Sequence, residues 1–254
     1  MKKLGHWITP PGWAKPQDVS DPMSGPIKTR LEDWQRQLTA RIGGDISTPD
    51  ARKAAKWHYN FVDHGWLRAL WRNLHKLGPQ VYRSNQPSAR QLTALHDRFG
   101  LKTVLNLRGD TDQSFYLFEA EACQKLGITL VDLALSASKA PSKAKLEELF
   151  RLLQTLPRPL LIHCKSGADR TGLAAFMYLL LIEQQPFAVA RRQLSFRYLH
   201  VANSPAGIQD HILRHYEVAL LATGIGFMEW VRQGYNPAAI TASFVRWRAG
   251  ERTL

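Results

Sequence analysis

The chain has 254 residues, of which 44% are hydrophobic, and this suits one ordinary domain with extensions. No apolar run reaches the roughly 18 residues of a membrane-spanning helix, and two cysteines are too few for a disulfide framework. The net charge of +13 favours anionic partners such as phosphorylated substrates, acidic lipid surfaces or nucleic acid, although a merely basic surface explains it equally well. We find no zinc-finger, helix-turn-helix or RNA-recognition pattern and therefore expect no nucleic acid partner.

The N-terminal part of the chain divides into two segments. Residues 1–50 are rich in proline and glycine and predict an irregular extension, and we expect no secretory signal there. Residues 51–79 are helical in pattern, basic and rich in tryptophan. Such a helix can make peripheral contact with an anionic membrane surface. Tryptophan is also a common anchor for docked segments, and we favour packing of the aromatic face onto the next domain.

Residues 80–223 alternate between strand and helix patterns. Apolar runs predict strands over 81–83, 102–107, 128–135 and 160–162, with helices between them that Ser88 and Ser142 cap. This alternation predicts an α/β fold, with a largely parallel sheet of four to five strands and helices on both faces. Ligands bind such sheets outside the carboxyl ends of the strands. Residues 224–254 predict a C-terminal helical appendage that packs on the domain.

The loop after the last of these strands carries the residues that indicate chemistry. It precedes a buried helix and reads His163-Cys164-Lys165-Ser166-Gly167-Ala168-Asp169-Arg170-Thr171. A loop wrapped onto a helix N-terminus points backbone N–H groups inward, where they stabilise a thiolate and bind a tetrahedral oxyanion. Gly167 lets the loop curl, Arg170 offers a planar fork for two phosphate oxygens, and Thr171 puts a hydroxyl near the sulfur. We expect Cys164 to attack phosphorus and form a phosphocysteine that is then hydrolysed.

The same loop resembles the signature of the cysteine-based protein tyrosine phosphatase superfamily, H-C-x-x-G-x-x-R-[S/T], at every fixed position. Residues 82–87 and 104–108 are also similar to bacterial relatives of the dual-specificity phosphatases, and the resemblance covers roughly residues 80–220. It implies a dual-specificity-phosphatase-like catalytic domain that needs no cofactor and no metal. It also implies that His163 orders the loop and that the substrate is bound by Lys165, Ser166, Gly167, Ala168 and Thr171.

The general acid is the open point of this site, since an Asp or Glu must protonate the leaving oxygen. The spacing to the cysteine in dual-specificity phosphatases matches Asp132, but the pattern places Asp132 inside a strand, and the loop after it holds no carboxylate. Asp169 is our first candidate because it is similar to a loop Asp of the myotubularin lipid phosphatases, although it can instead cap the following helix. Asp110 and Asp112 remain further alternatives.

Three functions are compatible with these residues. The first is a phosphatase of phosphotyrosine or phosphoserine/threonine proteins. The second is a phosphatase of a non-protein phosphate such as a phosphoinositide, phospholipid or glycolipid. This function is favoured by Asp169, Lys165 and the basic charge. The third is an inactive phosphate-binding module, which would not need the intact Cys164.

The two cysteines also bear on compartment and redox state. A thiolate nucleophile needs a reducing compartment, so we expect the protein in the cytoplasm. Cys123 can protect Cys164 by forming a disulfide on oxidation, but we favour a small buried cysteine.

Overall fold

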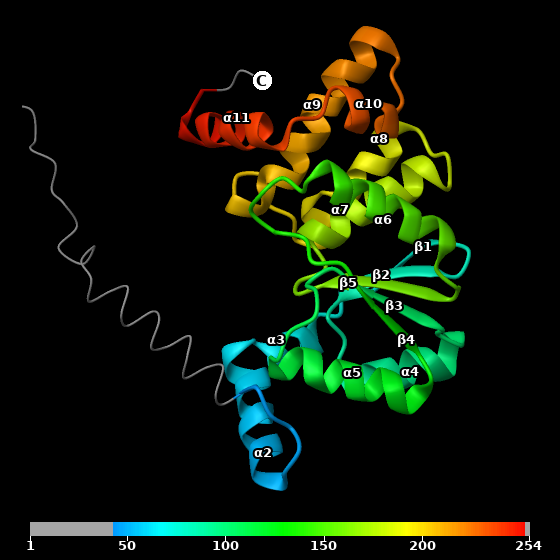
Figure 1. Cartoon of the computed structure of the whole chain (residues 1–254), viewed down its shortest axis with the longest axis vertical. Coiled ribbons are helices and arrows are strands. Elements are labelled where there is room, and N and C mark those ends of the chain that lie inside the picture. The colour runs from blue at the N-terminus through cyan, green and yellow to red at the C-terminus, as the bar shows by residue number, and fades with distance from the viewer. Residues whose placement is uncertain (1–42, 252–254) are drawn as a thin grey trace, which may run out of the picture. The chain divides into compact units, whose positions relative to one another are not determined.

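The centre of the domain is a five-stranded sheet in the order β1-β2-β5-β3-β4 (Figure 1). The structure is a computed structural model that describes residues 43–251. Residues 1–42 of the expected irregular extension therefore lie outside the described residues. The strands are β1 (His75–Gly78), β2 (Val81–Asn85), β3 (Thr103–Asn106), β4 (Thr129–Asp132) and β5 (Leu160–Cys164). β1 runs antiparallel to β2, and the other neighbouring pairs are parallel. The predicted largely parallel sheet is confirmed.

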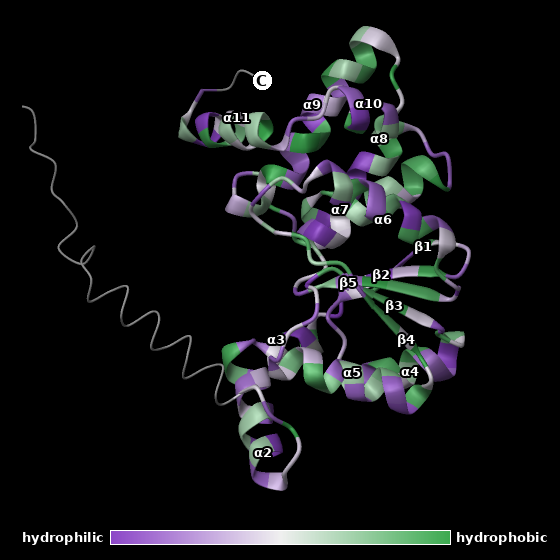
Figure 2. Cartoon of the chain, viewed as in Figure 1, coloured by the Kyte–Doolittle hydropathy of each residue, from purple (hydrophilic) through white to green (hydrophobic). Residues whose placement is uncertain are grey.

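Helices cover both faces of the sheet, as predicted (Figure 1). α4 (Ala89–Phe99) and α5 (Ser114–Leu126) lie on one face, and α6 (Lys143–Thr155) and α7 (Asp169–Leu181) lie on the other. Strand side chains alternate between two cores: Leu105 and Ile162 pack under α6 and α7, whereas Val104 and Leu161 pack under α4 and α5. Figure 2 shows the central strands as largely hydrophobic, which is expected for a sheet covered on both faces.

Local signals set the starts of two of these helices. The Ser88 hydroxyl accepts from the backbone N–H of Gln91, and the Gln91 side chain accepts from the backbone N–H of Ser88, which together form a capping box. The Ser142 hydroxyl accepts from the backbone N–H of Lys145 at the start of α6. Both predicted caps are confirmed.

The C-terminal part extends the core that lies under α6 and α7. It contains α8 (Phe187–Ala190), α9 (Ile208–Thr223), α10 (Phe227–Gln233), α11 (Pro237–Ala249) and 3-10 turns at Arg191–Gln193, Phe196–Tyr198 and Pro205–Gly207. The rings of Tyr216 and Phe227 meet edge to face at 5.0 Å, and both are buried in that core. The predicted packing of the appendage is therefore confirmed. Among residues 43–251, none of the helices has the length and apolar character that crossing a bilayer requires.

The segment before the sheet departs from the prediction. It forms α2 (Pro49–Trp57), a π-helix (His58–Val62), α3 (Gly65–Leu70) and then β1, so a helical pattern up to residue 79 is wrong at its C-terminal end. Trp57, Trp66 and Trp71 are 54%, 51% and 49% exposed. The predicted packing of the aromatic face onto the domain is wrong for these three side chains. Other contacts hold the segment, among them a 2.8 Å ion pair between Arg52 and Glu121 of α5 and an edge-to-face contact of Tyr59 with Phe118 of α5.

Candidate active site

The signature loop begins at the carboxyl end of the central strand β5. Cys164 is the last residue of β5, and Asp169 begins α7. Gly167 has a φ of +72°, and a Cβ at this position would lie 2.6 Å from the backbone of Ser84 and Asn85. Only glycine fits there without a shift of the backbone. The predicted order of strand, loop and helix is confirmed, and it sets Cys164 beside the N-terminus of α7.

The carbonyl groups of the loop are bound from the outside. The carbonyls of residues 165, 166 and 167 accept, in order, from the Gln86 backbone at 3.3 Å, the Asn73 side chain at 3.1 Å and the Arg83 guanidinium at 2.5 Å. Because these carbonyls face the scaffold, the concave side of the loop is left to backbone N–H groups, except that of Ala168, which donates to the Ser166 hydroxyl at 3.2 Å. This is the arrangement of an anion-binding nest.

Arg83 places a fixed cation behind the loop. It is fully buried, donates to the Gln193 side chain at 2.7 Å and lies 3.9 Å from the centre of the Tyr198 ring. Burial lowers the pKa of Arg83 to about 10, so the group stays charged at neutral pH. Its charge favours an anion in the loop, a role that the sequence alone did not indicate.

Arg170 and Thr171 lie at the helix end of the loop with donors to spare. Arg170 Nη1 is 3.4 Å from the carbonyls of Leu107 and Leu135, which follow β3 and β4. Within the described residues, the Arg170 Nε and the Thr171 hydroxyl are buried without a hydrogen-bond partner. Unpartnered buried donors are uncommon because they are destabilising, and a phosphate in the loop would accept from both. The donor set therefore fits a phosphate.

His163 lies on the opposite face of the sheet from Cys164, because consecutive strand residues alternate. Its Nε2 is 2.8 Å from one carboxylate oxygen of Glu119, and Gln86 Nε2 donates to the other oxygen at 2.8 Å. All three side chains are at most 1% exposed. The ring is held inside the core, where it is suited to brace the loop and not to reach a substrate. Sequence reasoning missed Glu119, which belongs to no motif.

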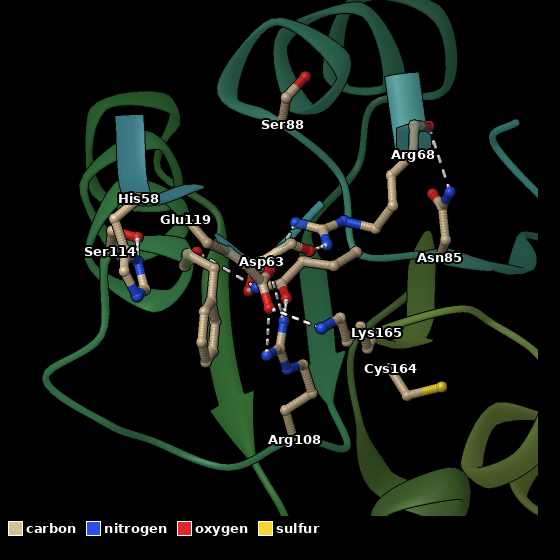
Figure 3. A network of polar contacts seen from close by, with 12 residues as sticks. His58, Asp63, Arg68, Asn85, Ser88, Arg108, Ser114, Glu119, Cys164 and Lys165 are labelled. Carbon is tan, nitrogen blue, oxygen red and sulfur yellow. Dashed lines mark hydrogen bonds and ion pairs between the residues drawn. The ribbon is translucent and has the colours of Figure 1, made fainter. Parts of the chain in front are cut away.

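A carboxylate from the N-terminal segment lies beside the signature loop (Figure 3). Asp63 is 5% exposed and lies 3.2 Å from Lys165 Nζ, 3.0 Å from Arg108 Nη2 and 2.7 Å from Arg68 Nη2. Burial acts to raise the pKa of Asp63, but the hydrogen bond from Arg108 and the charges of all three cations outweigh it and leave the pKa below 3.8. Asp63 is therefore ionised at neutral pH and holds no proton to give. No sequence pattern connects it to the loop.

Replacing Asp63 by asparagine is expected to destabilise the fold by about 3 kcal/mol at pH 7, because buried cations lose their counter-charge. The pKa of Asp63 is lower in the folded state than in the unfolded state. The ionised carboxylate therefore stabilises the fold fully at a pH above its unfolded pKa, and this stabilisation is lost as the pH falls through its folded pKa. The difference between wild type and variant should therefore shrink below pH 3.8. Urea unfolding of both proteins at neutral and acid pH measures this difference.

The control for this variant is Glu148→Gln, which removes an exposed ion pair with Arg151. Exposed pairs contribute little, so its urea midpoint should stay near that of wild type. An Asp63→Asn protein as stable as wild type at pH 7 would contradict the assigned role of the cluster.

Among the carboxylates considered as general acid, Asp169 lies at the signature loop itself. Its Oδ1 is 2.7 Å from Nδ1 of His200, whose side chain is 1% exposed, while 19% of the Asp169 side chain is exposed. Sequence reasoning missed His200, which lies in a turn with no motif. Asp110 and Asp112 are both exposed in the loop that follows β3.

Asp132 lies at the end of β4, on the face of α5. It pairs in register with Asn106, which pairs with His163, so Asp132 points to the side of the sheet opposite Cys164. Its two oxygens accept from Asn106 Nδ2 and the Tyr116 hydroxyl, each at 2.8 Å. These bonds hold Asp132 in the sheet.

The two cysteines lie in different cores. Cys123 packs under α4 and α5, whereas Cys164 belongs to the core under α6 and α7, and both are free thiols. Burial raises the pKa of Cys123 to about 12, which keeps this thiol protonated and unreactive. This placement favours the small buried cysteine over a protective disulfide.

Two curated proteins are similar to part of this chain. The dual specificity protein phosphatase TpbA of Pseudomonas aeruginosa (strain UCBPP-PA14) is 35% identical over 113 residues, which are 44% of this chain and 48% of TpbA. The inositol diphosphatase SIW14 of Saccharomyces cerevisiae is 30% identical over 103 residues, which are 39% of this chain and 35% of SIW14. The chain thus spans about half the length, or less, of these curated relatives.

Solved structures of the same two proteins resemble the chain over longer stretches. The crystal structure of P. aeruginosa TpbA has a TM-score of 0.44 at 22% identity and covers 68% of this chain and 91% of its own. The core catalytic domain of SIW14 has a TM-score of 0.46 at 20% identity and covers 60% of this chain and 91% of its own. A family model described as "DSP-PTPase phosphatase fused to NAD+ Kinase" matches residues 71–203, just over half of the chain. With the complete signature at the end of β5, this match shows that the chain belongs to that family, within the cysteine-based protein tyrosine phosphatase superfamily.

Proposed function

We propose that this chain is a cysteine-dependent phosphatase that hydrolyses phosphomonoesters through a phosphocysteine intermediate. The observation that carries the proposal is the position of Cys164, beside the N-terminus of α7 in a loop whose carbonyls are bound from the outside. The buried, unpartnered donors of Arg170 and Thr171 complete the set. A preorganised anion site around a thiol is what phosphoryl transfer to sulfur needs.

In the first step, the Cys164 thiolate attacks phosphorus, so that an S–P bond forms and the bond to the leaving oxygen breaks. Asp169 gives its proton to that oxygen. Arg170 binds two phosphate oxygens in its planar fork, and the backbone N–H groups of residues 165–167 bind the oxygens that face the loop. These contacts strengthen as charge moves onto the phosphoryl group.

In the second step, water attacks the phosphocysteine. Asp169, now ionised, accepts a proton from that water, the S–P bond breaks, and the electron pair returns to sulfur. The Thr171 hydroxyl donates to the departing thiolate. Inorganic phosphate leaves, and Asp169 again holds the proton for the next turnover.

For the substrate, we propose phosphotyrosine or phosphoserine/threonine residues of proteins. TpbA, at 35% identity, is named a dual specificity protein phosphatase. A non-protein polyanion would depend on extra cations at the loop, and Lys165 and Arg108 are two candidates for this role. Asp63 already pairs with both, which leaves less positive charge for additional phosphates.

The test combines trapping of the intermediate with a substrate panel. Acid quenching of the enzyme with an aryl phosphate within the first turnover should leave one phosphate on Cys164, located by peptide mass spectrometry. kcat/KM is then compared for a phosphotyrosine peptide, a phosphoserine peptide and an inositol polyphosphate. Preference for the peptides supports the proposal, and preference for the inositol polyphosphate moves the substrate to the non-protein class. Phosphate binding without release from any substrate would favour the inactive binding module.

A reducing compartment, the cytoplasm, completes the proposal. The mechanism needs Cys164 as a free thiolate, and both cysteines are free in the structure. An oxidising compartment would convert a reactive thiolate to forms that cannot attack phosphorus.

A further inference from the structure

The N-terminal segment holds many large apolar side chains in water. Fourteen large hydrophobic side chains are exposed among the described residues, and half of them lie within residues 57–71. Six of these form what we call the aromatic patch, and each is at least 49% exposed: Trp57, Phe61, Trp66, Leu67, Leu70 and Trp71. Single exposed apolar residues are ordinary, but such a concentration marks a binding surface.

The local geometry places these side chains in two groups, which are close in sequence. The rings of Trp57 and Phe61 lie 5.7 Å apart at the junction of α2 and the π-helix. In α3, residues 66 and 70 are spaced by four and residue 67 lies beside them, so these three share one side of the helix. Arg68 on the opposite face is buried against Asp63. α3 therefore contacts its surroundings through Arg68 and, within residues 43–251, leaves its apolar side chains exposed.

The charges along the same stretch of chain indicate the chemistry of its partner. Lys53, Lys56, Arg72 and Lys76 are exposed within the same stretch of chain, and between residues 49 and 76 the exposed carboxylate is Asp50 alone. Tryptophan and leucine that enter the headgroup region, with lysine and arginine beside them, are the features by which peripheral proteins bind anionic bilayers. Each cation near an anionic bilayer surface adds to that binding.

The patch is tied to the catalytic loop by several hydrogen bonds. The Asn85 side chain donates to the carbonyls of Arg68, at 3.2 Å, and Trp71, and Asn73 donates to the carbonyl of Ser166 in the loop. Asp63 adds the ion pair with Lys165. A surface bound by the patch would therefore lie at a fixed distance from Cys164.

We propose that the aromatic patch binds the surface of an anionic phospholipid bilayer. A second copy of the chain is a poorer occupant, because a symmetric contact would bring the same exposed cations, on chains of net charge +13, against each other. The proposal concerns binding only and stands independently of the proposed catalytic activity.

The test is flotation of the full chain with vesicles of phosphatidylcholine alone or mixed equally with phosphatidylglycerol. Wild type should float with the mixed vesicles and lose binding as salt rises. The double variant Trp66→Ser/Leu70→Ser should bind at least about tenfold more weakly, since two large side chains no longer leave water. Both side chains are exposed, so its melting temperature and its turnover of a soluble aryl phosphate should match wild type.

The matched control is Leu221→Ser/Val245→Ser, which removes two side chains that are 82% and 63% exposed in α9 and α11. This variant should bind vesicles as wild type does. Failure of wild type to float with the mixed vesicles, equal binding to both vesicle types, or equal losses in both double variants would overturn the proposal. A concentration-dependent dimer that only the patch variant loses, without vesicle binding, would assign the patch to a second copy.

Discussion

Replacing Cys164 by serine is expected to abolish phosphate release, with a fall in kcat of at least about 10⁴-fold, the scale seen when an enzyme loses its nucleophile. In the proposed mechanism the sulfur of Cys164 attacks phosphorus, and a serine hydroxyl in the same loop is a far weaker nucleophile. No phosphoenzyme should then be trapped by acid quenching.

The same variant should still bind phosphate and phosphopeptide. The bonds that hold the loop carbonyls, from Arg83, Asn73 and the Gln86 backbone, do not involve the sulfur. Fluorescence anisotropy with a labelled phosphotyrosine peptide measures this binding. Cys123→Ser makes the same chemical change in the other core and should keep its kcat. Turnover by Cys164→Ser near the wild-type rate would contradict the thiolate mechanism.

The signature loop could be predicted because everything that defines it is local in sequence. An apolar strand, a cysteine, a glycine and an arginine follow one another within a few residues, and their chemistry requires the turn that the structure has. Gly167 shows why: the backbone of β2 leaves no room for a Cβ there. The same holds for the caps at Ser88 and Ser142, where one hydroxyl and one nearby N–H decide the helix start.

The supporting residues could not be predicted because they meet the loop only in the folded chain. Asp63, Glu119 and His200 lie on three separate elements, and nothing near them in sequence distinguishes them from surface carboxylates or an ordinary histidine. Their roles depend on burial and on partners, which are tertiary quantities. β1 was missed for a related reason: it is a short edge strand whose pairing with β2, and not its own composition, defines it.

Asp132 shows an intermediate case, in which the sequence pattern was correct about the element. The strand placement of Asp132 is confirmed, and strand alternation then sets its direction. Cys164 and His163 are consecutive in β5, so their side chains lie on opposite faces of the sheet. The register aligns Asp132 with His163, and Asp132 therefore points to the face opposite Cys164. Of the four carboxylates considered as general acid, Asp169 is the one that lies in the signature loop.

Replacing Asp169 by asparagine is expected to slow hydrolysis of phenyl phosphate by about 10²- to 10⁴-fold, the usual contribution of a general acid. The rate with p-nitrophenyl phosphate should fall far less, because nitrophenolate leaves without a proton. Asparagine keeps the size of the side chain and an oxygen to face His200, but it has no acidic proton. The ratio of kcat/KM values for the two esters therefore reports proton donation separately from loop geometry.

His200 is the side chain that positions Asp169. The 2.7 Å contact between Asp169 Oδ1 and His200 Nδ1 fixes the direction of the carboxyl group at the mouth of the loop. Asp132→Asn is the control, since its carboxylate is bonded to Tyr116 and Asn106 and should affect both esters equally. If Asp169→Asn slowed the hydrolysis of both esters equally, Asp169 would only stabilise the shape of the loop and would not be the general acid. Discrimination between the esters by Asp132→Asn would move the general acid to β4, and it would require β4 to rearrange when substrate binds.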